Sequence, residues 1–318
     1  MTEYPDPQPL PGELRDPLPG PESTFLERHG ISPVLFAYLS LALIFLLYQI
    51  LGGGLTILLF GLKPTVDNAQ GFRIITGVAQ ICFILIPTLV LARLASPAPF
   101  KLLGIRKPGA RLILPAIAGM LSLQQLMQIL LTLQDRLPVP DAVQRFSEQF
   151  RAAIEEAYRL LVGSATVPEL LFVLVIVACI PSIVEELLFR GLIMNSLQAK
   201  LSPIRSAVIT GIIFGAYHMN PFGFVGLAAI GIYLGILATR SRSVVLAMVA
   251  HFVNNAVAVI AMYAGVSDAW IVTGDAALMS SGELLGTSLP LLALFVASIV
   301  WFYRLTRVPE PASPEASV

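Results

Sequence analysis

The chain has 318 residues, of which 56% are hydrophobic and 13% are charged, and its mean hydropathy is +0.80. This composition excludes a soluble globular protein and is typical of a protein with several membrane spans. Basic and acidic residues number 20 each, so the formal net charge is zero. A nucleic-acid partner is excluded as well, because such partners usually require a strongly basic face.

Both ends of the chain are expected to be disordered tails. Seven prolines stand among polar and acidic residues in the first 24 positions, and no basic segment precedes an apolar stretch as in a signal peptide. We therefore expect a Pro-rich tail over 1–29. Residues 309–318 have the same character, which leaves 30–308 as one membrane-embedded domain.

The domain is predicted to be all-α, with about eight transmembrane helices. Long apolar runs closed by proline, glycine or charge predict helices at 34–62, 73–96, 111–133, 167–199, 204–220, 223–240, 243–264 and 285–305. Residues 137–163 differ, because apolar residues recur there among charged ones at spacings of three and four. That spacing predicts an amphipathic helix outside the hydrocarbon.

Alternate connections between the predicted helices are basic. They carry Lys101, Arg106, Lys107 and Arg111, then Lys200 and Arg205, then Arg240 and Arg242. The connection 265–286 holds Asp268, Asp275 and Glu283 and no Lys or Arg. Since basic loops usually stay in the cytoplasm, we expect both termini there. The lipid bilayer is then the chain's first partner, and its oligomeric state is left open.

Ionisable residues interrupt the predicted helices at three places. Each such group costs at least about 2.5 kcal/mol near the bilayer centre unless it is paired or solvated. The three places are Glu185-Glu186 with Arg190, Phe214 with His218, and His251 with Asn255. Two of the three histidines of the chain thus lie in apolar helices. This coincidence favours a functional site over a structural ion-pair network or isolated packing histidines.

Helical spacing separates the roles of the two glutamates. Glu186 and Arg190 are four residues apart on one face, so they are expected to form an ion pair. Glu185 points about 100° away and is free to face a cavity. If the chain turns near Ser202, Glu185 lies 17 residues before the turn and His218 lies 16 after it, at matching depth.

The other predicted residues follow from the same spacing. His251 shares a face with Asn255, whose amide could hold an oxyanion or orient the imidazole, and it is expected in one hydrated cavity with Glu185 and His218. Phe214 shares a face with His218 and is either cavity packing or core. Gly211 with Gly215, and Gly231 with Gly235, form small-residue faces that let two helices pack closely.

The three motifs together resemble those of the CPBP family, which includes CAAX-prenyl proteases and bacteriocin-processing or Abi-type proteins. The family pattern of Glu-Glu-x-x-x-Arg, Phe-x-x-x-His and His-x-x-x-Asn/Asp is met in order on successive helices. Its residues here are Glu185, Glu186, Arg190, Phe214, His218, His251 and Asn255. The residues around Arg190 resemble bacterial members more than eukaryotic prenyl-protein proteases, which implies a bacterial cytoplasmic membrane.

The resemblance implies an intramembrane endopeptidase acting on membrane-associated proteins or peptides. Glu185 would activate a water for attack on a peptide carbonyl, and Asn255 would stabilise the oxyanion. His218 and His251 would position that water, or would join Glu185 in holding a divalent metal such as Zn²⁺. The family is divided between metal-dependent and glutamate-dependent mechanisms, and both stay open here.

The alternative is a non-catalytic membrane protein, either a scaffold or a proton-coupled transporter that uses the same Glu/His cluster as a relay. Pro181 interrupts a helix just before Glu185, as in broken transporter helices. No matching interruption is apparent in the other half of the chain. The sequence therefore favours the peptidase.

Overall fold

A computed structural model describes residues 24–138, 140–266 and 279–307 of the chain. Helices make up the regular structure of these ranges, which contain no β-strand. The all-α prediction is therefore confirmed. Residues 1–23 and 309–318 of the two expected tails lie outside the described residues.

Seven helical stretches are long and apolar enough to cross a membrane, which confirms a polytopic membrane protein. Each begins and ends within four residues of a predicted helix: Pro33–Phe60, Ala69–Ala95, Ala110–Gln134, Val167–Leu197, Phe224–Ser241, Val244–Tyr263 and Ser281–Leu305. The remaining predicted helix, 204–220, is present as α12 (Pro203–Tyr217). Its 15 residues cover only about 22 Å, less than the roughly 30 Å hydrocarbon core.

Wider π-helical turns interrupt three of the spans. The first span consists of α2 (Pro33–Phe45), a π segment at Leu46–Gly52 and α3 (Gly53–Phe60). The second consists of α4 (Ala69–Gln80), a π segment at Ile81–Leu85 and α5 (Ile86–Ala95). The fourth runs through α9 (Val167–Val173), Leu174–Cys179, α10 (Ile180–Glu186), Leu187–Met194 and α11 (Asn195–Leu197). Such turns are frequent at functional sites, and two of them flank the predicted glutamates.

The first described helix corrects the expected tail boundary. α1 (Phe25–Arg28) falls inside the stretch expected to be disordered. Thr24 and Glu27 form a reciprocal capping box at its start, and Leu26 is buried in a core cluster. Residues 25–28 therefore belong to the fold.

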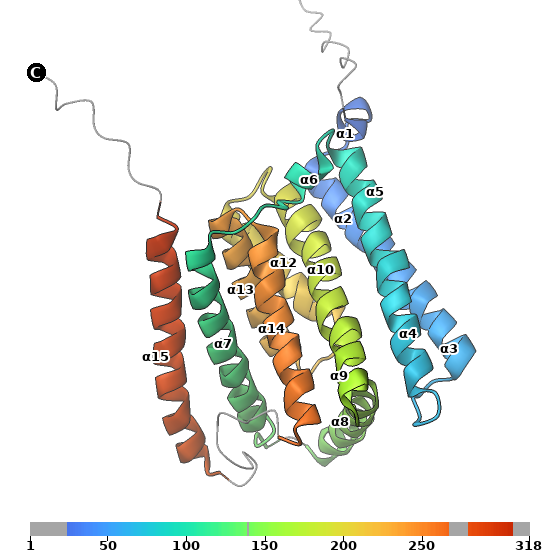
Figure 1. Cartoon of the computed structure of the whole chain (residues 1–318), viewed down its shortest axis with the longest axis vertical. Helices are drawn as coiled ribbons and strands as arrows, with labels where there is room; N and C mark the ends of the chain where they lie inside the picture. Colours follow the sequence, from blue (N-terminus) through green and yellow to red (C-terminus); the bar gives the residue numbers. More distant parts are fainter. Residues whose placement is uncertain (1–23, 139, 267–278, 308–318) are drawn as a thin grey trace, which may run out of the picture.

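The helices that carry the predicted site lie at the centre of the bundle. Figure 1 shows α10, α12, α13 (Phe224–Ser241) and α14 (Val244–Tyr263) between α7 (Ile113–Gln134) with α15 (Ser281–Leu305) on one side and α2 to α5 on the other. One core cluster joins α2, α10 and α12, and a second joins α7, α13 and α14. The short α6 (Pro99–Leu102) connects α5 to α7 at the upper end of the view.

Helices α12 and α13 meet backbone to backbone at the predicted glycine faces. A Cβ atom added at Gly211 would stand 2.4 Å from the backbone nitrogen of Ile232, and one added at Gly231 would stand 2.8 Å from the carbonyl oxygen of Gly211. Only glycine permits this approach, as the small-residue pattern predicted. The contact brings the backbone of Gly231 next to the buried polar residues of the site.

The predicted amphipathic helix is α8 (Asp141–Val162), which is not among the candidate spans. It lies at the lower end of the bundle in Figure 1. Arg73 of α4 donates to the carbonyl oxygens of Leu160 and Leu161 at 2.8 and 2.9 Å, and it pairs with Glu169 of α9 at 2.6 Å. Buried Arg73 thus ties the end of α8 to two spans.

Candidate active site

Glu185 and His218 face each other across the turn that the sequence predicted at Ser202. Glu185 Oε2 lies 4.0 Å from His218 Nε2, so the expected equal depth of the two residues is confirmed. Their side chains are 17% and 32% exposed. The sequence placed His218 inside a helix, whereas α12 ends at Tyr217 and His218 forms its C-cap.

The hydrogen bonding of His218 fixes the role of each ring nitrogen. Its Nδ1 lies 2.8 Å from the carbonyl oxygen of Phe214. Because a carbonyl oxygen only accepts, Nδ1 carries the hydrogen, and in the neutral ring Nε2 presents its lone pair toward Glu185. One water molecule could therefore donate a hydrogen to each of the two groups.

Glu186, Arg190 and His251 form a second, buried cluster beside that pair. Glu186 Oε1 accepts from Arg190 Nη1 at 2.8 Å, which is the expected ion pair, and from His251 Nδ1 at 2.9 Å. Arg190 Nη2 donates to the carbonyl oxygen of Gly231 at 2.7 Å, so the glycine contact supplies a ligand to the cluster. All three side chains are at most 5% exposed. A buried charge pair of this kind holds its helices in one arrangement.

Phe214 packs in the middle of these polar groups. Its ring centroid is 4.6 Å from the ring of His218 and 5.8 Å from the ring of His251. The Arg190 guanidinium carbon lies 4.6 Å from the same centroid, within the range of a cation–π contact. Phe214 is therefore both core and the wall that separates the two imidazoles.

Asn255 joins α14 to the fourth span. Its Nδ2 donates to the carbonyl oxygen of Val177, in the π segment Leu174–Cys179, at 3.1 Å, and its Oδ1 accepts from Asn254 at 3.0 Å. Among the described residues it makes no hydrogen bond with His251. The expectation that Asn255 orients this imidazole is thus not met, and one N–H of its amide is left for another acceptor.

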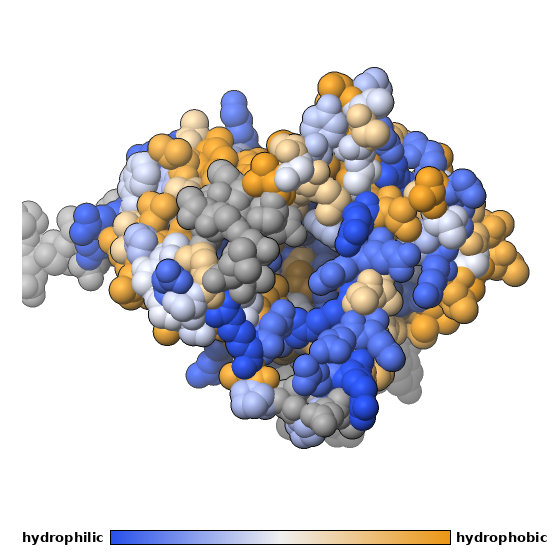
Figure 2. Space-filling view, turned by 90° about the horizontal axis from the view of Figure 1, so that it is seen from below, coloured by the Kyte–Doolittle hydropathy of each residue, from blue (hydrophilic) through white to orange (hydrophobic). Residues whose placement is uncertain are grey.

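The predicted residues come together, but as two pairs and not as one triad. Glu185 faces His218, while His251 directs Nδ1 to the neighbouring Glu186. The first pair is partly exposed and the second is buried. Two acids one residue apart therefore stand in two environments. Seen from below, the molecule is hollowed at the centre of the face, with hydrophilic side chains along part of the rim of this hollow (Figure 2).

Comparison with known proteins agrees with these motifs. Residues 167–257 match the family model described as type II CAAX prenyl endopeptidase Rce1-like. This stretch forms an Rce1-like domain. The match includes every predicted site residue and begins with α9. No curated protein and no solved structure matched the chain.

Three side chains of the Rce1-like domain were predicted as metal ligands: Glu185, His218 and His251. The described residues contain no group of three or more His, Cys, Asp or Glu side chains that could hold a metal ion. A catalytic zinc site usually has three protein ligands and an open position. Here Glu185 and His218 lie 4.0 Å apart, while His251 donates Nδ1–H to Glu186 and keeps the lone pair of its Nε2.

One contact of the Rce1-like domain could not be found from the sequence. Gln49, in the π segment of the first span, donates to the carbonyl oxygen of Tyr217 at 2.9 Å. The Tyr217 hydroxyl is buried and has no hydrogen-bond partner among the described residues. Tyr217 is the last residue of α12 and directly precedes His218. Since 168 residues separate Gln49 from Tyr217, no local spacing indicates the contact.

Proposed function

We propose that this chain hydrolyses peptide bonds of membrane-associated proteins or peptides with a water molecule held between Glu185 and His218. The observation that carries the proposal is the 4.0 Å separation of Glu185 Oε2 and His218 Nε2, with both side chains partly exposed. A general base must lie within hydrogen-bond reach of the proton that it takes. The Rce1-like domain supports an endopeptidase at the coarse level.

In the proposed reaction, Glu185 takes one proton from the water while Nε2 of His218 orients the second. The water oxygen forms a bond to the peptide carbonyl carbon. Glu185 then gives its proton to the amide nitrogen, and the carbon–nitrogen bond breaks to leave a carboxylic acid and an amine. Each step is assigned to these two side chains and water alone.

We assign the oxyanion to the remaining N–H of Asn255. One hydrogen of its amide is held by Val177, and its oxygen is held by Asn254, so the plane of the amide is fixed before substrate binds. A donor fixed in this way stabilises charge in the transition state without reorganising. Asn255 thus has two roles in the proposal: it stabilises the oxyanion, and it joins α14 to the π segment Leu174–Cys179.

Glu186, Arg190 and His251 are assigned a positioning role. Arg190 neutralises Glu186 at 2.8 Å, so the acid next to Glu185 does not add an uncompensated negative charge beside the base. The cluster also fixes α10 against α14, since Glu186 and His251 are 2.9 Å apart. The base and its water therefore sit on a rigid support.

The experiment compares the purified full-length chain with Glu185→Gln in proteoliposomes that contain membrane-peptide libraries. Mass spectrometry should find cleavage products with the wild type and none with the variant. Proton uptake is recorded in parallel, because the transporter alternative predicts uptake without cleavage. Glu185→Gln should also retain bound substrates, which identifies them. Cleavage by this variant at the wild-type rate would contradict the proposal.

A further inference from the structure

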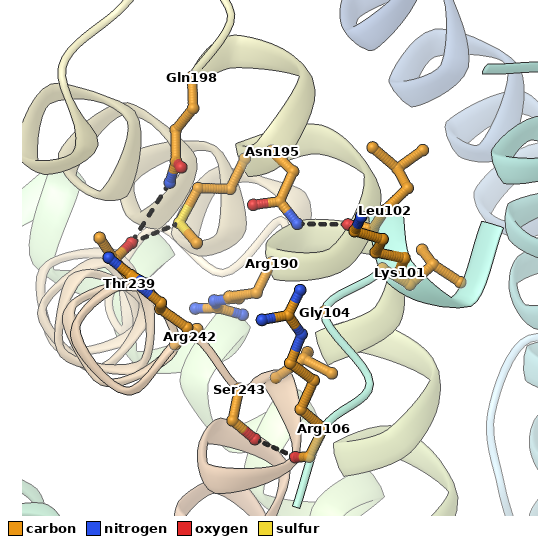
Figure 3. A pocket seen from close by; sticks show the side chains of 14 residues that line it. Lys101, Leu102, Gly104, Arg106, Arg190, Asn195, Gln198, Thr239, Arg242 and Ser243 are labelled. Carbon is orange, nitrogen blue, oxygen red and sulfur yellow. Dashed lines mark hydrogen bonds between the residues drawn. The ribbon is translucent and has the colours of Figure 1, made fainter. Parts of the chain in front are cut away.

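A cavity of about 360 Å³ is lined by Arg190, whose guanidinium also binds Glu186, but by neither Glu185 nor Glu186. It opens among the connection from α6 to α7, the π segment Leu187–Met194 and the turn between α13 and α14. Figure 3 shows these lining side chains, and none of them is an Asp or a Glu. The proposed hydrolysis does not use this space.

Four cationic side chains line the cavity: Lys101, Arg106, Arg190 and Arg242. In Figure 3 the guanidinium groups of Arg106 and Arg190 reach into the cavity toward each other. Lys101, Arg106 and Arg242 are exposed residues, and none has an ion-pair partner among the residues that the structure describes. Like charges gathered around one space repel each other unless an anion neutralises them.

Arg190 forms the buried floor of the cavity and has a donor to spare. Its Nη1 and Nη2 are bound by Glu186 and by Gly231. Its Nε is buried and has no hydrogen-bond partner within the described part of the chain. Arg190 is 1% exposed, so solvent does not satisfy this group. A buried N–H of a guanidinium beside a cavity is a ready donor for an anionic oxygen.

The turn between α13 and α14 adds two further features. Arg242 has a left-handed backbone with φ of 54°, a conformation that favours glycine over arginine at a helix end. The next residue, Ser243, caps α14 without a side-chain hydrogen bond to the helix, and Ser243 and Val244 line the cavity. The first turn of α14 therefore adds partial positive charge to the same space.

We propose that this cavity binds a phosphate-bearing anion. A phosphate offers several strong acceptor oxygens to several donors, which suits three cations unpaired in the described part of the chain, the spare N–H of Arg190 and a helix start better than a single carboxylate does. The cavity lies at the end of the bundle that carries the basic connections. Basic pockets between membrane helices at such an end bind anionic lipid headgroups. An anionic phospholipid and free phosphate share this chemistry, so the experiment separates them.

The test is thermal unfolding of the purified full-length chain in neutral detergent at constant ionic strength. The probes are inorganic phosphate, dioctanoyl phosphatidylglycerol and, as the zwitterionic control, dioctanoyl phosphatidylcholine. The cavity variant is Arg106→Gln with Arg242→Gly, which removes two charges and places glycine at a position whose positive φ favours it. The matched control is Lys200→Gln with Arg205→Gln, which removes two charges at the same end outside the cavity.

We expect a saturable rise in Tm of about 2–4 °C for the wild type and the control variant. The rise should be at least fourfold smaller for the cavity variant. A rise with both phosphate and phosphatidylglycerol supports the site for either source, and a rise with phosphatidylglycerol alone assigns it to the lipid. Equal responses from cavity and control variants, or no response of the wild type to either probe, overturn the proposal. If the double variant does not fold, the Tm rise of Arg106→Gln alone is compared with that of the control variant.

Discussion

Glu185 and Glu186 are neighbours in sequence, yet their carboxylates serve different helices. Glu185 faces the His218 imidazole of α12 at 4.0 Å and is 17% exposed, whereas Glu186 bonds the His251 imidazole of α14 at 2.9 Å and is fully buried. The turn of about 100° between successive helical residues produces this division. It lets one short stretch of chain supply both the partly exposed carboxylate that we propose as the base and a buried charge.

Replacement of Glu185 by Gln should abolish proteolysis and leave stability unchanged. The change is nearly isosteric, and among the described residues the carboxylate makes no close hydrogen bond that the amide would break. Loss of a general base typically lowers the rate by about 10²–10⁴-fold. The measurements are the peptide cleavage rate and the Tm in detergent. A variant that cleaves at the wild-type rate would refute the role of Glu185.

Replacement of Glu186 by Gln should lower stability as well as activity. Arg190 would lose its counter-charge while it remains buried, and His251 would lose its carboxylate partner. Removal of one partner of a buried ion pair costs about 3–5 kcal/mol. Thermal unfolding of the variant checks the expectation. A matched double variant, Glu186→Gln with Arg190→Met, should recover part of the loss; a single variant that melts like the wild type would contradict the pairing.

The two histidines should respond differently to replacement by alanine. His218 is 32% exposed at the end of α12, so its removal should reduce cleavage with little change in Tm. His251 is 4% exposed and bonds Glu186, so its removal should lower both. Parallel activity and melting measurements on the two variants provide the check. Equal loss of stability in both would show that His218 is structural.

The sequence predicted which polar residues lie close together better than it predicted the hydrogen-bond partner of each one. Hydropathy located the spans, because few residue types are tolerated in hydrocarbon, and the four-residue spacing gave the Glu186–Arg190 pair. The partner of His251 depends on how α14 is rotated against α10, and packing determines that rotation. For the same reason, the contacts of Arg73 and the basic cavity around Arg190 were not predicted.

The length of α12 was overestimated because the predicted helix, 204–220, was extended up to Pro221. The helix stops at Tyr217, His218 caps it, and Met219 adopts a positive φ of 51°. The first proline after this end is Pro221, four residues beyond Tyr217, so the helix stops before the break that the sequence marks. A helix end leaves His218 more exposed than a continuous span would.

Replacement of Gly211 by Ala should destabilise the chain. The added Cβ would stand 2.4 Å from the backbone nitrogen of Ile232, which cannot move without separating α12 from α13. Overpacking of this kind costs about 1–3 kcal/mol. Gly54→Ala in α3 is the control, since nothing lies within 4 Å of its added Cβ and alanine favours a helix. Relative to the wild type, the Tm of Gly211→Ala should fall and the Tm of Gly54→Ala should rise.

The basic end of the bundle should face the cytoplasm, as the distribution of loop charges predicts. The predicted outer connection, 265–286, includes residues 267–278, which lie outside the described residues, so Val266 is the position to test. In a background with Cys82 and Cys179 replaced by Ser, Val266→Cys should react with a membrane-impermeant maleimide added to intact cells. Lys200→Cys at the basic end should react only after the membrane is opened. The reverse pattern would invert the orientation, and the phosphate-binding cavity would then face the opposite leaflet.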